Sequence, residues 1–177
     1  MPHSDGPFDI LGLEARFEID PAEVRQRTVR RAARLHPDRA SDPVTAAEQA
    51  RELARVNEAS GILLDDLARA ELLLAMHGGP GPSDDRTLPE GFLESILATR
   101  MELEEAVASG DEEGRRRLGD WARSEWAERR AAVAGILDRQ PPPVADDLLV
   151  VRRELNRWRY SQRMLEQLEP NDTVPGP

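Results

Sequence analysis

The chain has no cysteine and no lysine, few aromatic residues and no long apolar run. Without cysteine it forms neither a disulfide nor a thiolate metal site. No apolar stretch approaches the roughly 20 residues that a membrane-spanning helix needs. Residues 1–5 also lack the basic and apolar character of a signal sequence. A cytoplasmic location, with no membrane contact, is therefore the default expectation.

The composition indicates a helical protein. Of the 177 residues, 39% are hydrophobic, 33% are charged and only 4% are aromatic, which favours cores built from Leu, Ala and Val. This length allows one domain or two small ones. The net charge is −10 and all 24 basic residues are Arg. General nucleic-acid binding is disfavoured, because phosphate contacts need clustered cations.

Turn signals divide the first part of the chain into three helical segments. A short helix is expected near 7–11. Asp20 and Pro21 form an N-cap followed by proline at the first helical position, and the helix that they begin is expected to reach residue 35. A third helix is expected over about 44–67, where apolar residues recur at helical spacing. Two helices of this length joined by a short loop predict an antiparallel hairpin.

A turn-rich segment over 78–85 interrupts the helical pattern and predicts a domain boundary. Three more helices are expected after it, near 89–108, 111–138 and 145–169, with short connections that favour a three-helix bundle. The predicted fold is therefore all-α, with a hairpin domain over 1–77, a linker over 78–88 and a three-helix domain over 89–177.

The tripeptide His36-Pro37-Asp38 falls where the second helix is expected to end. Pro37 has no amide hydrogen and biases His36 away from helical geometry, so a polar corner is expected at the tip of the hairpin. A cationic helix face in a chain of net charge −10 is expected to steer an acidic partner, unless it is only a solvated surface. Five residues of the preceding helix make this face: Arg25, Arg27, Arg30, Arg31 and Arg34.

This arrangement resembles the J domain, through which co-chaperones stimulate the ATPase of DnaK-type chaperones. The likeness includes Pro-Phe-Asp-Ile-Leu-Gly-Leu at 7–13 and Arg-Glu-Leu-Ala-Arg-Val-Asn-Glu-Ala at 51–59. The segment 67–78 is similar to the one that joins the two domains of HscB, the iron–sulfur cluster assembly co-chaperone. The resemblance implies that the basic helix and His36-Pro37-Asp38 bind a chaperone ATPase of the HscA or DnaK type.

The helix near 89–108 has an apolar surface wider than a bundle helix needs. Two interpretations are open: either a wide core covers the second of its two apolar stripes, or that stripe binds a partner. Helical counting gives an inward stripe of Phe92, Ile96, Leu103 and Val107. The second stripe, a quarter-turn away, comprises Leu93, Leu97 and Met101 and is bordered by Arg100, Glu104 and Glu105.

The resemblance to HscB favours partner binding by the second stripe. HscB uses apolar and acidic residues of this helix to bind the scaffold protein IscU, and Leu93, Leu97 and Glu105 stand at matching positions. The chain departs from the family pattern elsewhere on this helix. Glu94 replaces an apolar residue, while Ala98 and Met101 replace acids.

In the last helix, Tyr160 is expected to point away from the inward stripe and to be exposed, next to Met164. It falls where the family carries an aromatic residue in its scaffold-binding surface. A different register of the alignment gives this role to Trp158. The inward stripe is expected to comprise Leu148, Val151, Leu155, Trp158 and Leu165. Trp121 and Trp126 are expected to be core or half-buried packing residues.

One departure lies in the expected third helix. Ser60-Gly61 stands where relatives of the J domain carry a bulky aromatic residue. Glycine within a helix is destabilising by about 1 kcal/mol relative to alanine. The missing aromatic ring also reduces the apolar area that the core buries. This departure is therefore expected to lower the stability of the domain, and it does not change the assignment of function.

Neither catalysis nor a cofactor or metal site is predicted. His36 has no partner group that suits general-base chemistry, and the spacing of His3 and His77 does not match a metal-binding motif. The sequence predicts a non-enzymatic co-chaperone whose partners are an HscA/DnaK-type ATPase and an IscU-type scaffold. A J-domain protein with an unrelated client is the first alternative. A DNA-binding regulator that uses the Arg-rich helix is the second, and the acidic remainder of the chain disfavours it.

Overall fold

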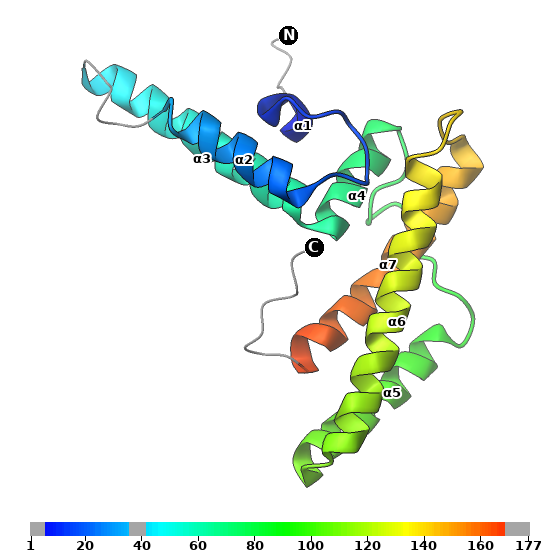
Figure 1. Ribbon diagram of the computed structural model, residues 1–177. Helices are drawn as coiled ribbons and strands as arrows, with labels where there is room; N and C mark the ends of the chain where they lie inside the picture. The colour runs from blue at the N-terminus through cyan, green and yellow to red at the C-terminus, as the bar shows by residue number, and fades with distance from the viewer. Residues whose placement is uncertain (1–5, 36–41, 169–177) are drawn as a thin grey trace. The chain divides into compact units, whose positions relative to one another are not determined.

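The computed structural model describes residues 6–35 and 42–168, and within them it contains α-helices and no strand (Figure 1). The described helices form two compact units, the first ending at Arg69 and the second beginning at Ala70. The predicted all-α fold is confirmed. The helices are α1 (Pro7–Leu11), α2 (Pro21–Ala32), α3 (Pro43–Leu64), α4 (Asp66–Met76), α5 (Phe92–Ser109), α6 (Glu112–Leu137) and α7 (Ala145–Leu168).

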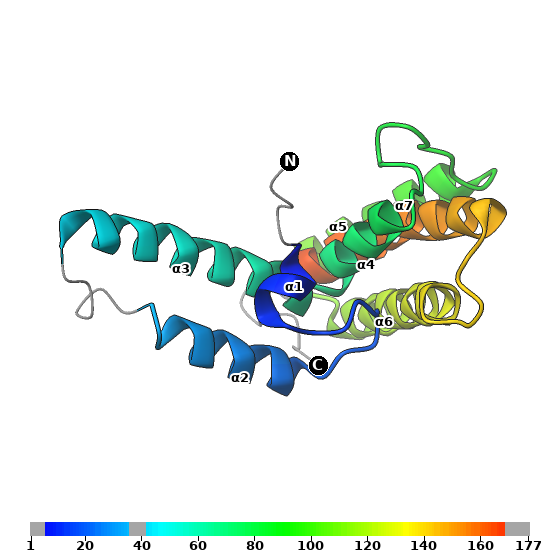
Figure 2. The ribbon, with the colours of Figure 1, turned by 90° about the horizontal axis from the view of Figure 1, so that it is seen from above.

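In the first unit, α2 and α3 lie side by side as a hairpin, and α1 packs against both (Figure 2). Each helix contributes a buried side chain to the shared core, including Phe8 from α1, Val24 from α2 and Val56 from α3. Burial of such side chains stabilises the unit by roughly 1.5–3 kcal/mol each relative to exposure. Gly12 ends α1 in the left-handed conformation, at φ 67°, which glycine adopts without a steric penalty.

The start of α2 follows the prediction, and its end does not. The Asp20 carboxylate accepts a hydrogen bond from the amide of Ala22 at 2.8 Å, and Pro21 is the first helical residue. The helix ends at Ala32 instead of residue 35. Beyond Ala32 the amides of Arg34 and Leu35 bond to carbonyls only three residues earlier, which is the tighter 3₁₀ geometry common at helix ends.

The helix predicted over 44–67 is two helices with a break at Asp65. Asp65 is extended (φ −90°, ψ 114°), and its carboxylate accepts the amide of Ala68 at 2.9 Å. It therefore ends α3 and caps the start of α4. The sequence prediction was wrong here because no glycine or proline marks the break.

A buried arginine holds the beginning of α4 in the first unit. The guanidinium of Arg69 donates to the carbonyl of Phe17 at 2.8 Å and lies 4.9 Å from the centre of the Phe17 ring. It also donates to the carbonyl of Leu63 and pairs with Asp66. Arg69 is only 2% exposed. These bonds compensate for the free-energy cost of burying its charge.

In the second unit, α6 packs against both α5 and α7. Gly91 precedes α5 in the left-handed conformation, so this helix begins at Phe92, three residues later than predicted. Side chains of all three helices form one core cluster, with Ile96, Trp121 and Leu165 packed against it. The cluster comprises Leu103, Leu118, Ala122, Met164 and Leu168.

The inward stripe predicted for α7 is confirmed for Leu148, Val151, Leu155 and Trp158, which are buried, whereas Leu165 is only partly buried. The ring of Trp126 meets that of Trp158 edge-on at 6.0 Å. Trp121 and Trp126 are half-buried, as predicted.

Candidate partner-binding surfaces

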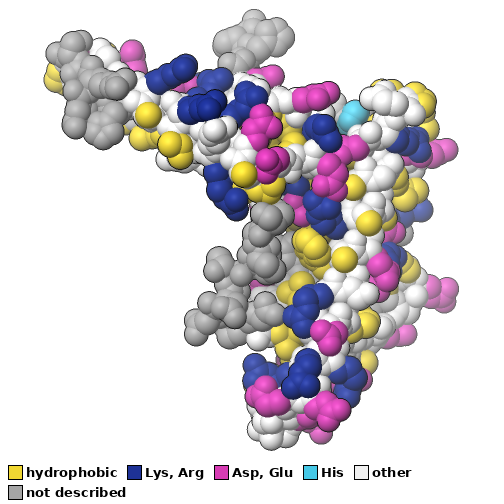
Figure 3. All heavy atoms as spheres, viewed as in Figure 1, with side chains coloured by type: hydrophobic (Ala, Val, Ile, Leu, Met, Phe, Trp, Pro, Cys, Tyr) yellow, Lys and Arg dark blue, Asp and Glu magenta, His cyan; other side chains and the backbone are white. Residues whose placement is uncertain are grey.

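The outer surface of α2 is cationic. Its arginines are exposed apart from Arg27, which is half-buried, and on the face shown in Figure 3 the basic side chains gather along the α2–α3 hairpin. The ion pairs found between described residues include none of Arg25, Arg30, Arg31 and Arg34. Their charges are therefore not neutralised within the part of the chain that the structure describes.

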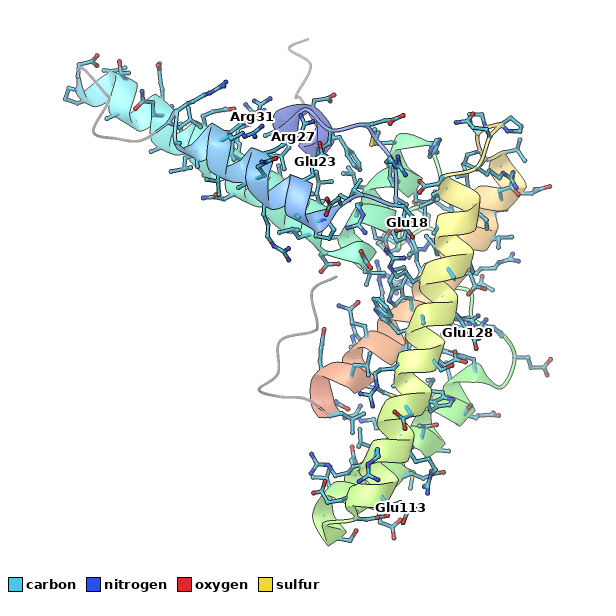
Figure 4. All side chains as sticks on the ribbon, in the orientation of Figure 1. Glu18, Glu23, Arg27, Arg31, Glu113 and Glu128 are labelled. Atoms are coloured by element: carbon cyan, nitrogen blue, oxygen red, sulfur yellow. The ribbon has the colours of Figure 1, made fainter. Side chains whose placement is uncertain are left out.

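Arg27 differs from these residues because it is bonded within the unit. Its guanidinium pairs with Glu23 at 2.7 Å and donates to the carbonyl of Gly12 at 2.6 Å. Figure 4 shows Arg27 and Arg31 on the side of α2 next to α1. Arg27 therefore joins α2 to the end of α1, a structural role that helical counting did not predict.

His36, Pro37 and Asp38 lie outside the described residues. The structure describes the chain up to Leu35 on one side of this tripeptide and from Asp42 on the other. Asp42 caps α3, since its carboxylate accepts the amides of Val44 and Thr45 at 2.9 and 3.0 Å. The proposed role of the tripeptide stays a prediction.

On α5, the second apolar stripe is exposed. Leu93, Leu97 and Met101 are 55%, 60% and 61% exposed, respectively. No core of the second unit covers them, although the helix that carries them is packed through Leu103 and Ala106. We call these three residues the α5 apolar patch.

The inward stripe predicted for α5 was wrong at one position. Val107 is 54% exposed, and Ala106 is buried in its place. After Leu103, the core side of this helix includes Ala106, three positions later, and not Val107, four positions later. Both spacings lie on one side of a helix, so counting alone did not distinguish them.

Charged side chains border the α5 apolar patch. The guanidinium of Arg100 bonds to the carboxylate of Glu104 at 3.1 Å, and both side chains are exposed. Glu94 and Glu105 are exposed on the same helix. The patch therefore combines apolar area with a mainly acidic border, a composition suited to a partner that carries apolar and basic side chains.

Tyr160 is half-buried, so the expectation of an exposed ring next to Met164 was wrong. Its ring meets that of Phe92 edge-on at 5.6 Å, and the guanidinium of Arg157 lies 5.5 Å from the centre of the Phe92 ring. Met164 is buried in the core cluster. Counting along α7 alone misses this contact, because the partner ring belongs to α5.

A buried polar network was also missed by the sequence analysis. Arg152 is fully buried and makes a bidentate pair with Glu71, at 2.6 and 2.7 Å. Arg159 pairs with the same carboxylate. The signal lay in α7, where helical spacing places Arg152 and Asn156 among the buried apolar residues.

Asn156 extends this network to the segment before α5. Its amide nitrogen donates to the carbonyls of Asp85 and Thr87, and its oxygen accepts from Arg152. Hydrogen bonds from Thr87 lower the pKa of the Asp85 carboxyl below its ordinary value of 3.8. The segment at 85–87 is thus bonded to α7 in the second unit.

Over residues 6–35 and 42–168, no group of three or more acidic, histidine or cysteine side chains is placed to hold a metal ion. In the same ranges no helix is both long and apolar enough to cross a membrane. The surfaces that stand out are those suited to contact with other proteins.

The fold and these surfaces define an all-α protein of two units, with a cationic hairpin in one unit and an exposed apolar patch in the other. No protein-family model matches the chain. It is similar to the "Co-chaperone protein HscB homolog" of Ralstonia nicotianae, with 34% identity over 143 residues that cover 76% of this chain and 78% of the relative. The homolog of the same name from Bordetella avium is 27% identical over 170 residues, which cover 93% and 96%.

Two solved structures have the same fold. "Chaperone HscB from Vibrio cholerae" matches with a TM-score of 0.78 and 21% identity, over 93% of this chain and 96% of that one. The human co-chaperone protein HscB matches with a TM-score of 0.81 and 22% identity, over 96% and 83%. The chain belongs to the HscB co-chaperone family, as the sequence resemblance predicted.

Proposed function

We propose that this protein is a cytoplasmic co-chaperone that links two partners in iron–sulfur cluster biogenesis. The second unit binds an IscU-type scaffold protein through the α5 apolar patch and its acidic border. The first unit stimulates ATP hydrolysis by an HscA- or DnaK-type chaperone through α2 and the tripeptide His36-Pro37-Asp38. Membership of the HscB family supports both assignments.

The exposed stripe on α5 is the observation that carries the scaffold assignment. Three large apolar side chains at helical spacing remain accessible although the rest of α5 supplies a core face. Contiguous apolar surface of this kind is typical of interaction sites. The border of Glu104 and Glu105 favours a basic partner surface and thereby one orientation of the bound partner.

The scaffold assignment is tested by replacing Leu93 and Leu97 with serine. The Leu93→Ser/Leu97→Ser variant is expected to bind an IscU-type scaffold at least about tenfold more weakly, because buried leucines at an interface are each worth more than about 1 kcal/mol. Titration calorimetry measures the affinity. Val150→Ser is the matched control, since Val150 is an exposed apolar residue of the same unit. If wild-type protein does not bind the scaffold, a different client is indicated.

The cationic face of α2 supports the ATPase assignment. Arg25, Arg30 and Arg34 are exposed and make no ion pair with a described residue, so their field is available to an acidic surface. Arg27 contributes differently in this proposal. It holds α1 against α2 and thereby supports the docking surface from within the unit.

The ATPase assignment is tested with His36→Gln. This variant is expected to lose stimulation of the chaperone ATPase while its helicity and its affinity for the scaffold stay at wild-type values. Steady-state ATP hydrolysis by the chaperone, with and without the co-chaperone, measures the effect. Stimulation that persists in His36→Gln and also in Arg30→Ala/Arg34→Ala contradicts the proposed docking surface.

A further inference from the structure

The second unit contains a hollow of about 350 Å³ between the segment before α5 and one side of α7. Three arginines, Arg86, Arg159 and Arg163, belong to its lining, together with Leu88 and Tyr160. None of the lining residues carries a carboxylate. In a chain of net charge −10, this hollow is a local reversal of sign.

Two of the three arginines have no ion-pair partner among the described residues. Arg159 pairs with Glu71, whose carboxylate also accepts two hydrogen bonds from Arg152. Arg86 and Arg163 are exposed and make no ion pair with a described residue. Both guanidinium groups therefore have their donors available to an anion that enters the hollow.

The wall of the hollow is held in place by the Asn156 network. Asn156 is 7% exposed and donates to the carbonyls of Asp85 and Thr87, at 3.0 and 3.2 Å, on either side of Arg86. The backbone that carries Arg86 is thus bonded to the helix that carries Arg163. A ligand that uses both arginines meets an ordered backbone, which reduces the entropic cost of binding.

A residue of the hollow also contacts α5, the helix that carries the apolar patch. Tyr160 lines the hollow, and its ring contacts that of Phe92, the residue before Leu93. The lining of the basic hollow therefore contacts, through one pair of aromatic rings, the helix that carries the apolar patch and its acidic border. A protein that covers both needs a carboxylate at one end of its contact surface and a basic group at the other.

We propose that this hollow binds an aspartate or glutamate side chain of the client that covers the α5 apolar patch, and that Arg86 and Arg163 are its ligands. Guanidinium groups bind carboxylates with two parallel hydrogen bonds, a geometry that fixes orientation as well as adding affinity. The opposite charges of hollow and patch border allow one orientation of the client and disfavour the reverse. The identity of the client rests on the proposed function, whereas the chemistry of the hollow does not.

The first test measures binding of an IscU-type scaffold to the full-length Arg86→Ala/Arg163→Ala variant at several salt concentrations. We expect about tenfold weaker binding at low salt, as charge-assisted hydrogen bonds are lost, and a smaller loss of affinity as salt is added. Leu93→Ser/Leu97→Ser is expected to weaken binding while keeping the wild-type salt dependence. Arg116→Ala, an exposed arginine on α6 without an ion pair to a described residue, is the matched control. Wild-type affinity and salt dependence in the double-arginine variant would overturn the proposal.

A second test does not depend on the client. A short polyglutamate peptide is titrated into labelled protein while the backbone amide resonances of residue 86 and of Asn156 are followed by nuclear magnetic resonance. These resonances are expected to shift in wild-type protein and in Arg116→Ala, and not in the double-arginine variant. Shifts of equal size in all three proteins, or in none, contradict a carboxylate site. If the scaffold does not bind to wild-type protein but the peptide does, the proposed client is wrong. The assignment of the hollow as a carboxylate-binding site then still holds.

Discussion

At the scale of single residues, the chain uses arginine in two ways that differ by burial. Arg69 and Arg152 are almost fully buried, and each makes several bonds to carbonyl or carboxylate oxygens. The arginines of the α2 surface and of the hollow are exposed and keep donors available. The planar guanidinium, which makes several hydrogen bonds at once, suits both roles better than the compact ammonium of lysine.

Gly61 is a residue whose replacement is expected to stabilise the protein. It lies within α3 and is exposed, and a Cβ atom there would meet no atom within 4 Å. Gly61→Ala is expected to raise the free energy of unfolding of the first unit by about 1 kcal/mol, because alanine loses less backbone entropy in a helix. Urea denaturation followed by far-ultraviolet circular dichroism measures this.

Gly12→Ala provides the contrasting variant. Gly12 has φ 67°, and an added Cβ would lie 3.3 Å from the guanidinium of Arg27. This substitution is expected to destabilise the first unit, since a residue with a Cβ atom costs about 1–2 kcal/mol in the left-handed conformation. Equal effects of the two substitutions would contradict the distinction between an open helical site and a strained turn.

At the scale of helices, local signals predicted the starts and ends that side chains or glycine determine. Asp20 before Pro21 marked the start of α2, and the end of α5, expected near residue 108, falls at Ser109, before Gly110 in the left-handed conformation. The break at Asp65 was missed, because a carboxylate that caps the next helix looks like any other helical acid in the sequence. Glycine and proline act through the backbone alone, whereas the role of Asp65 depends on where the chain turns.

The faces of the helices were predicted less completely than their extents. Helical periodicity distinguished the exposed Leu93 and Leu97 from the buried Leu103, but it placed Val107 inward and Tyr160 outward. Both errors concern residues near the edge of a packed face. Their burial depends on the neighbouring helix, and a periodic pattern within one helix does not contain that information.

The pair between Glu71 of α4 and Arg152 of α7 is expected to be the most sensitive polar contact of the second unit. Glu71→Gln leaves the fully buried Arg152 without its anion, which is expected to cost about 3 kcal/mol. Tryptophan fluorescence in a urea titration measures this, because Trp121, Trp126 and Trp158 all belong to the second unit.

Two variants control for the Glu71 result. Glu112→Gln removes the acid of an exposed pair with Arg115, and less than about 1 kcal/mol is expected. Glu71→Gln combined with Arg152→Met removes both charges and is expected to recover part of the lost stability. Equal losses for Glu71→Gln and Glu112→Gln would show that burial of Arg152 does not govern the contact.

At the scale of the whole molecule, α4 is the helix that both units share. Arg69 bonds within the first unit and Glu71, two residues later, bonds within the second. The division therefore falls inside a helix, whereas the sequence placed the first domain boundary after residue 77, at the start of the glycine-rich segment. Glycine and proline mark where a helix ends, and the packing of side chains marks where a compact unit ends.

The distribution of aromatic residues allows the independence of the two units to be measured. The first unit contains Phe8 and Phe17 but no tryptophan, so tryptophan fluorescence reports the second unit alone, while circular dichroism reports the helices of both. Leu63→Ala removes a fully buried side chain from the first unit, at an expected cost of about 2–5 kcal/mol.

We expect Leu63→Ala to lower the urea concentration at which the first unit loses its circular dichroism signal. The midpoint of the fluorescence transition, which reports the second unit, is expected to stay unchanged. Leu155→Ala, which removes a fully buried leucine from the second unit, is expected to lower the fluorescence midpoint. This follows because each unit has a core of its own and unfolding is cooperative within a core. A fluorescence midpoint that falls equally in both variants would mean that α4 transmits unfolding from one unit to the other. The basic and apolar surfaces would then belong to a single cooperative body.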